Sequence, residues 1–209
     1  MRLFLSSYGF GSDPKNFLRL FQMSGKRVLI IANAQDDRYA EVRTASVDRD
    51  LRQLYDLNMD ASELDLRNYF DDQVALEKIL GAADGVWVRG GNTFVLRRAF
   101  ARSGADSVML NLLLKDSLVF GGYSAGTLML TPSLRGYELL DDSTVVPEGY
   151  PTEVSMDGMG IVSFQIIPHS QSPDLEKLER YYLESGVPYK ALRDGEVLIV
   201  DGDRQETLP

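Results

Sequence analysis

The sequence has no cysteine and a single histidine, His169, among its 209 residues. The lack of cysteine excludes disulfide bridges, a cysteine nucleophile, thiolate zinc sites and iron–sulfur clusters. A metal centre built from two or three histidines cannot form within one chain either. We therefore predict that the protein uses no metal and no cofactor. Any reaction that needs a histidine must use His169.

Long apolar runs and an excess of basic residues are also missing. No apolar run approaches the roughly 20 residues that span a membrane, and the apolar stretch in Met1–Ser7 is too short for the core of a signal peptide. Lys and Arg number 22 against 31 Asp and Glu, a net charge of −9 that disfavours binding to nucleic-acid phosphates. We expect a cytoplasmic protein without membrane or nucleic-acid partners. A homodimer is compatible with these features.

The residues that are present describe an ordinary folded protein. Hydrophobic residues make up 44% of the chain and charged residues 25%, which predicts one domain spanning residues 1–209. Short apolar runs alternate with amphipathic stretches of helical period. This alternation predicts an α/β fold, in which a mostly parallel sheet is covered by helices on both faces.

The expected elements follow from these runs. Strands are predicted at Arg2–Ser6, Arg27–Ala32, Leu64–Leu66, Gly85–Val88, Leu118–Gly121, Gly160–Ile167 and Val197–Val200. Helices are predicted at Phe17–Met23, Tyr39–Leu57, Asp71–Leu80, Thr93–Arg102, Ser107–Lys115, from Ala125 onward and at Asp174–Ser185. The irregular segment Leu134–Met159 is too long for a tight loop, which makes it a candidate for a functional role.

The segment Gly122-Tyr123-Ser124-Ala125-Gly126 lies between a predicted strand and a predicted helix. It matches G-x-S-x-G, the pattern of a nucleophile held on a sharp strand-to-helix turn. The amide of Ala125 would then be a natural donor to an oxyanion. The alternative is a glycine-rich turn in which the serine only caps the helix.

Gly90-Gly91-Asn92-Thr93 stands at the end of another predicted strand and the start of a helix. Paired glycines would present unhindered N–H groups at the carboxyl edge of the sheet, where open α/β folds bind ligands. These groups could complete an oxyanion hole. The alternative is a tight turn in which Asn92 or Thr93 caps the helix.

His169 follows the predicted strand Gly160–Ile167. A serine hydroxyl needs a neighbouring base to take its proton, and this chain has no other histidine for that task. A triad also needs an acid that orients the imidazole. Asp194, just before the final predicted strand, and Asp141 or Asp142, in the long irregular segment, are the candidates.

Four segments, in this order and approximate spacing, resemble the peptidase E (aspartyl dipeptidase) family. They are Gly90–Phe94, Gly122–Gly126, Pro168-His169 and Leu192–Gly195. The resemblance covers nearly the whole chain and implies a flavodoxin-like α/β sheet related to class I glutamine amidotransferases. It also implies a serine peptidase with a Ser-His-Glu arrangement that cleaves dipeptides with N-terminal aspartate.

The same resemblance implies roles for individual residues. Ser124 would be the nucleophile, His169 the base, and the amides of Gly91 and Ala125 the oxyanion hole. Asp194 falls at the position of the family's glutamate, and its shorter reach keeps Glu196 and Asp142 open as the third member. Arg89 stands where many members have a glycine.

We therefore expect a serine peptidase that acts on dipeptides or small amides, with a small peptide as its partner. The β-carboxylate of an aspartyl substrate needs a cation, for which Lys177 and Arg180 are candidates, and Asn92 is a further candidate for substrate binding. One alternative is an esterase of the α/β-hydrolase type, with Ser124, Asp141 or Asp142, and His169. Another is a catalytically silent module on the same fold that binds a small ligand or a partner.

Overall fold

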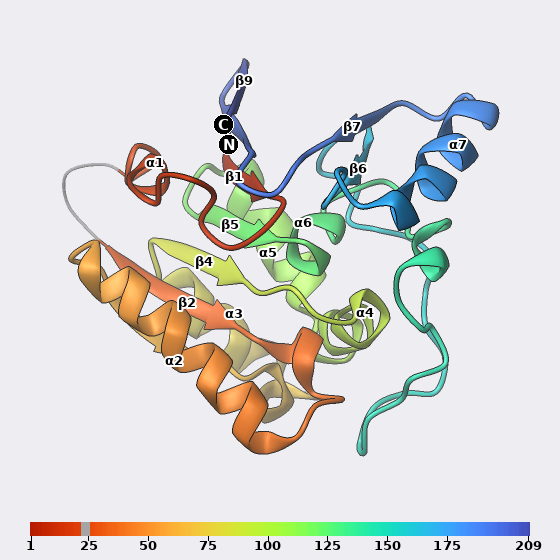
Figure 1. The fold of residues 1–209 in the computed structure, drawn as a ribbon. Helices are drawn as coiled ribbons and strands as arrows, with labels where there is room; N and C mark the ends of the chain where they lie inside the picture. The colour runs from red at the N-terminus through yellow and green to blue at the C-terminus, as the bar shows by residue number, and fades with distance from the viewer. Residues whose placement is uncertain (22–25) are drawn as a thin grey trace.

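The computed structural model describes residues 1–21 and 26–209, and within them seven strands form one central sheet (Figure 1). The strand order is β3-β2-β4-β5-β1-β8-β9. These strands are β1 (Arg2–Ser6), β2 (Arg27–Ile31), β3 (Asp60–Glu63), β4 (Gly85–Val88), β5 (Val119–Tyr123), β8 (Val197–Asp201) and β9 (Arg204–Leu208). The first five are parallel, whereas β8 runs antiparallel to β1 and β9 antiparallel to β8. Two further strands, β6 (Gln165–Ile167) and β7 (Tyr189–Ala191), form a separate parallel pair.

Helices cover both faces of the central sheet (Figure 1). They are α1 (Lys15–Leu18), α2 (Ala40–Asp56), α3 (Gln73–Gly81), α4 (Thr93–Ser103), α5 (Ala105–Leu114), α6 (Ala125–Leu128) and α7 (Glu176–Glu184). Short 3-10 turns are η1 (Asn33–Gln35), η2 (Leu66–Tyr69), η3 (Tyr137–Leu139) and η4 (Pro173–Leu175). Helices α1 and α2 pack on one face, and α3, α4 and α5 on the other.

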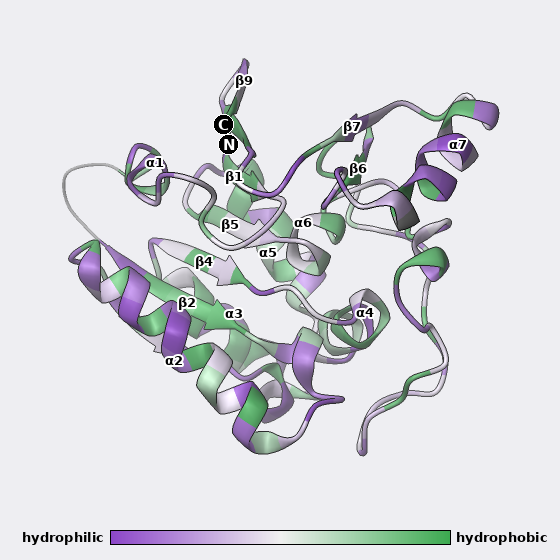
Figure 2. Cartoon of the chain, viewed as in Figure 1, coloured by the Kyte–Doolittle hydropathy of each residue, from purple (hydrophilic) through white to green (hydrophobic). Residues whose placement is uncertain are grey.

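The alternating direction of side chains along each strand explains why helices cover both faces of the central sheet. In β1, Leu3 and Leu5 point into the cluster under α3, α4 and α5, whereas Phe4 points to the opposite cluster beside Phe17 and Trp87. Successive side chains of a strand face opposite sides, so a strand that is apolar throughout needs a cover on each side. Figure 2 shows this pattern, with apolar strands at the centre and hydrophilic bands on the outer surface of α2.

The predicted fold class is confirmed, and most predicted elements lie within a few residues of the observed ones. Two strand predictions were wrong, the first in position and the second in extent. The strand near Leu64–Leu66 is instead Asp60–Glu63, which pairs with β2, and Leu66 begins η2. Of Gly160–Ile167 only the last three residues form a strand, and that strand pairs with β7 outside the central sheet. The predicted helix Phe17–Met23 was also wrong in extent, because α1 ends at Leu18, and the last two residues of that prediction lie outside the described residues.

The register brings several chain segments to one edge of the sheet. Ser6 at the end of β1 lies opposite Tyr123 at the end of β5, and Val88 at the end of β4 lies opposite Gly122. Because β8 is antiparallel, its first residue, Val197, meets the same edge opposite Ser6. Residues that follow β1, β4 and β5, and residues that precede β8, therefore gather there.

Among the described residues, no helix is both long enough and apolar enough to span a lipid bilayer.

The close approach of α6 to β4 yields a test of packing. A β-carbon on Gly126 would overlap the backbone carbonyl of Val88, so Gly126→Ala is expected to lower the free energy of unfolding by about 1–3 kcal/mol, as overpacked core positions do. Gly81→Ala is the matched control, because a β-carbon there meets no atom within 4 Å. Urea denaturation of both variants provides the measurement, and equal stability of the two would contradict the packing argument.

Candidate active site

Ser124 occupies the turn between β5 and α6 in an unusual backbone conformation. Its φ of 47° and ψ of −122° are rare for a residue with a side chain, and such strain gathers at functional sites. The turn is held from both sides, since the Ser124 amide donates to the Ser6 carbonyl (3.2 Å) and its own carbonyl accepts from the Thr127 amide (2.8 Å). This is the geometry expected of a serine displayed on a strand-to-helix turn.

The loop after β4 packs against this turn. A β-carbon on Gly90 would lie only 3.0 Å from the β-carbon of Ser124, so glycine allows the two loops to touch. Within the described residues, the backbone amides of Gly91 and Ala125 donate no hydrogen bond to another residue. Both are therefore available to an oxygen that carries developing negative charge.

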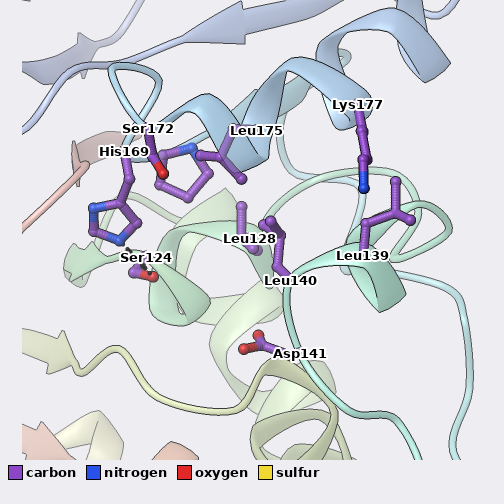
Figure 3. Close-up of a pocket in the computed structure, with 10 residues that line it drawn as sticks. Ser124, Leu128, Leu139, Leu140, Asp141, His169, Ser172, Leu175 and Lys177 are labelled. Atoms are coloured by element: carbon purple, nitrogen blue, oxygen red, sulfur yellow. Dashed lines mark hydrogen bonds between the residues drawn. The ribbon is translucent and has the colours of Figure 1, made fainter.

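His169 lies beside Ser124. Its Nε2 atom is 3.2 Å from the Ser124 hydroxyl oxygen (Figure 3), and its Nδ1 atom is 2.6 Å from Oδ1 of Asp194. One ring nitrogen thus faces the serine and the other faces a carboxylate. In the tautomer with the proton on Nδ1, the imidazole donates to Asp194 and can accept the proton of the serine.

Asp194 is held by a second contact. The buried hydroxyl of Ser7 donates to Asp194 Oδ1 (2.9 Å) and accepts from the backbone amide of His169 (2.7 Å). Desolvation opposes ionisation of Asp194, but the hydrogen bonds from His169 and Ser7 outweigh it and lower the pKa of this carboxyl group. Asp194 is therefore an anion at neutral pH, as the partner of an imidazolium should be.

The small sheet positions both of these side chains. His169 follows β6 and Asp194 follows β7, and the two strands pair in parallel with Ile167 opposite Ala191. The Leu192 amide donates to the Ile167 carbonyl at 2.8 Å, which continues the pairing toward the site. Pairing of β6 with β7 therefore brings together two residues that are 25 positions apart in the chain.

The other acids predicted as possible third members of the triad form hydrogen bonds with residues other than His169. Glu196 accepts from the backbone amide of Arg193, and Asp142 accepts from the amide and hydroxyl of Thr144. Asp141 accepts from the amide (3.0 Å) and the hydroxyl (2.6 Å) of Thr93. The structure thus brings Asp194, and none of these three acids, to His169.

The substrate-binding candidates occupy different places. Asn92 caps α4 by accepting from the amides of Phe94 and Val95, and its Nδ2 donates to the Asp142 carbonyl. Lys177 lines the pocket beside Ser124, whereas Arg180 is exposed farther along α7 and does not line that pocket.

This pocket, here called the mixed-charge pocket, has a volume of about 570 Å³ (Figure 3). It is lined by Ser124, Leu128, Leu139, Leu140, Asp141, Pro168, His169, Ser172, Leu175 and Lys177. Burial raises the pKa of Asp141, although its hydrogen bonds from Thr93 act in the opposite direction. The pocket therefore combines apolar walls with the acidic Asp141 and the basic Lys177, next to the catalytic candidates Ser124 and His169.

Arg89 lies under the site and is only 2% exposed. Its guanidinium forms an ion pair with the buried Asp50 (3.1 Å) and donates to the Tyr123 hydroxyl (2.7 Å) and the Ser46 carbonyl. The Asp50 carboxylate also accepts from the indole of Trp87. Arg89 therefore links α2 to the residue before Ser124.

Ser7 is a site residue that the sequence patterns did not identify. It directly follows β1 at the carboxyl edge of the sheet, and a small polar residue at that position was the available signal. The neighbouring Tyr8 was also missed. Its ring packs edge-on against the rings of Tyr123 and His169, with centroids 5.9 and 6.1 Å apart.

Comparison with known proteins identifies the family. The sequence pattern of peptidase family S51 matches residues 9–208. The chain belongs to peptidase family S51. Peptidase E of Streptomyces coelicolor is 37% identical over 135 residues, which are 60% of this chain and 52% of that protein. A Drosophila melanogaster protein named as an alpha-aspartyl dipeptidase is 30% identical over 138 residues, which are 61% of this chain and 54% of that protein. The predicted family resemblance is thereby confirmed.

This chain thus spans about half the length of these curated relatives of family S51. Among solved structures, a Listeria monocytogenes protein described as a peptidase E superposes with a TM-score of 0.78 at 23% identity, covering 99% of this chain and 97% of that one. A peptidase from an acI-B1 actinobacterium superposes with a TM-score of 0.73 at 16% identity, covering 99% and 86%. These two structures share the fold of this chain.

The contact between His169 and Asp194 predicts how reactive Ser124 is. Asp194→Asn is expected to slow labelling of Ser124 by a fluorophosphonate about 10³- to 10⁴-fold, because an amide at this position favours the wrong tautomer of the imidazole. Glu196→Gln removes a nearby acid that does not touch His169, and its labelling rate should stay within about twofold of the wild type. Equal labelling rates for the two variants would disprove the assigned orientation.

Proposed function

We propose that this chain is a serine dipeptidase in which Ser124, His169 and Asp194 form the catalytic triad. The observation that carries the proposal is the unbroken line of contacts from the Ser124 hydroxyl through both ring nitrogens of His169 to Asp194. Membership in peptidase family S51 supports the reaction class. The names of the relatives, peptidase E and alpha-aspartyl dipeptidase, support a dipeptide substrate.

In the acylation step, the Ser124 oxygen attacks the carbonyl carbon of the peptide bond while its proton passes to His169 Nε2. The carbonyl π electrons move to oxygen, and the resulting oxyanion accepts hydrogen bonds from the Gly91 and Ala125 amides. The carbonyl then re-forms, the C–N bond breaks, and the leaving amine takes the proton from His169 Nε2. Asp194 stabilises the imidazolium while the histidine holds that proton.

In the deacylation step, water replaces the amine. His169 takes a proton from the water, and the hydroxide adds to the ester carbonyl of acyl-Ser124. Collapse of this second oxyanion breaks the ester bond, and the Ser124 oxygen recovers its proton from His169. Every proton transfer in both steps uses His169 Nε2, so the proposed mechanism needs only the one histidine that the chain contains.

The mixed-charge pocket supports an acyl group derived from an N-terminal aspartate. Such a residue carries an α-ammonium group and a β-carboxylate. The pocket contains a side chain of opposite charge for each, Asp141 for the ammonium and Lys177 for the carboxylate. Asp141 binds Thr93 through Oδ2 and forms no ion pair in the described part of the chain, so it can pair with an incoming ammonium. We assign the β-carboxylate to Lys177 rather than Arg180, because only Lys177 lines the pocket.

Removal of the nucleophile tests the reaction class. Ser124→Ala is expected to abolish turnover of dipeptides across a panel of Asp-X substrates, both α- and β-linked, with little change in melting temperature, because the change removes one oxygen from a partly exposed side chain. Failure of the wild type to react with a fluorophosphonate would instead favour a silent binding module. Turnover retained by Ser124→Ala would exclude the serine mechanism.

Substitution of the pocket cation tests the acyl-side specificity. Lys177→Gln should lower kcat/KM for Asp-Ala about 10- to 100-fold, the range expected for loss of a charge-assisted hydrogen bond. Hydrolysis of Asn-Ala, whose side chain is neutral, should change much less. Arg180→Gln is the matched control, since it removes a positive charge from the same helix outside the pocket. A larger loss in Arg180→Gln than in Lys177→Gln would transfer the role to Arg180.

A further inference from the structure

A second pocket, of about 310 Å³, adjoins the same catalytic pair. It is lined by Tyr8, Gln35, Arg38, Ser46, Arg49, Arg89, Gly90, Gly91, Tyr123, Ser124 and His169. The two pockets share only Ser124 and His169, so the reacting atoms stand between them. We call the second one the arginine pocket.

Among the residues that the structure describes, the lining of the arginine pocket includes three arginines and no carboxylate. Arg89 is buried and neutralised by Asp50. The other positive charges of the lining belong to Arg38 and Arg49, which are both exposed. In a chain with a net charge of −9, such a local surplus of positive charge marks a place where an anion is attracted.

Among the described residues, neither exposed guanidinium forms a buried ion pair, although Arg49 lies near enough to Asp50 to be attracted by it. Within the same part of the chain, Arg38 pairs only with the carboxylate of its neighbour Asp37, at 3.6 Å with 59% of the arginine side chain exposed. Asp141 attracts Arg38 without forming an ion pair with it. Arg49 makes no ion pair or side-chain hydrogen bond with residues 1–21 or 26–209. Exposed pairs such as Arg38–Asp37 contribute little, so both arginines can bind an incoming anion.

The position of Arg49 is set by the buried network below it. Arg89 donates to the Ser46 carbonyl and pairs with Asp50, which ties this turn of α2 to the loop after β4. Arg89 also donates to the hydroxyl of Tyr123, the residue before Ser124. The helical turn that carries Arg49 is thereby held beside the nucleophile turn.

The chemistry of a dipeptide requires an anion site on one side of the scissile bond. His169 protonates the leaving amine, and in a dipeptide the carbon that bears this amine also bears the free carboxylate. The leaving group must therefore occupy a pocket that borders His169. The mixed-charge pocket contains Asp141, which would repel that carboxylate. The arginine pocket, by contrast, is lined in the described part of the chain by arginines and by no acid.

Given the dipeptidase function proposed above, on which this inference rests, we propose that the arginine pocket is the leaving-group subsite. Arg38 and Arg49 bind the C-terminal carboxylate of the substrate there, by the charge-assisted hydrogen bonds that arginine forms with carboxylates. The pocket therefore selects peptides that end one residue after the scissile bond. Amides, whose C-terminus is neutral, lose this interaction.

A binding experiment that needs no turnover tests this subsite. In a Ser124→Ala background, Asp-Ala is expected to bind about 10- to 100-fold more tightly than Asp-Ala amide in calorimetric titrations, the ratio expected for a charged hydrogen-bonding group. Combining Arg38→Gln and Arg49→Gln in that background should reduce the ratio to within about threefold, because the residual difference is long-range Coulomb attraction. Arg52→Gln, which removes the same charge from the same helix outside the pocket, should keep the preference.

The outcomes separate this subsite from the dipeptidase function. Three results would contradict the proposed subsite. They are equal binding of Asp-Ala and its amide, a preference for Asp-Ala that persists without both arginines, and no binding of either ligand. Turnover by the active chain decides the function independently. Hydrolysis of Asp-Ala and its amide with equal kcat/KM would support the dipeptidase function and contradict the proposed subsite. If neither compound is hydrolysed, but Asp-Ala still binds more tightly than its amide in an arginine-dependent manner, the subsite is supported and the dipeptidase function is contradicted.

Discussion

The contact between the turn after β5 and the loop after β4 is the constraint on which the rest of the site depends. Gly126 lies against the Val88 carbonyl and Gly90 lies against Ser124, so the two loops approach more closely than side chains would permit. This approach gathers the strained Ser124 and the amides of Gly91 and Ala125 at one edge of the sheet. The parallel register of β4 and β5 makes it possible, because neighbouring parallel strands end at the same edge.

A chain of hydrogen bonds completes the site from segments that are distant in sequence. Ser7 follows β1, His169 follows β6 and Asp194 follows β7, yet the Ser7 hydroxyl contacts both other residues. The small β6–β7 sheet is therefore more than an appendage of the fold, since its pairing sets the distance between the imidazole and its acid. With one histidine in the chain, all of the proposed proton transfer depends on this arrangement.

The two pockets beside Ser124 differ in charge although they share the same catalytic pair. One contains an acid and a base among apolar walls, and the other contains arginines without an acid. A dipeptide with an N-terminal aspartate has the matching distribution, with both signs on the acyl side and a single negative charge on the leaving side. This asymmetry supports both the proposed substrate class and the direction in which it binds.

The fold class, the strand-to-helix position of Ser124 and the assignment of any histidine role to His169 could be predicted from the amino-acid sequence. Each depends on composition or on patterns among neighbouring residues, such as hydrophobic periodicity and glycine motifs. The three-dimensional arrangement was needed to show that Asp194, rather than Glu196 or Asp142, contacts the imidazole and that the Ser7 hydroxyl contacts Asp194. It was also needed to show that Arg89 is buried. It also revealed the half-buried β7 and the mostly exposed β9, whose short sequences carry no apolar pattern. These features arise from pairing between distant segments, which no local pattern encodes.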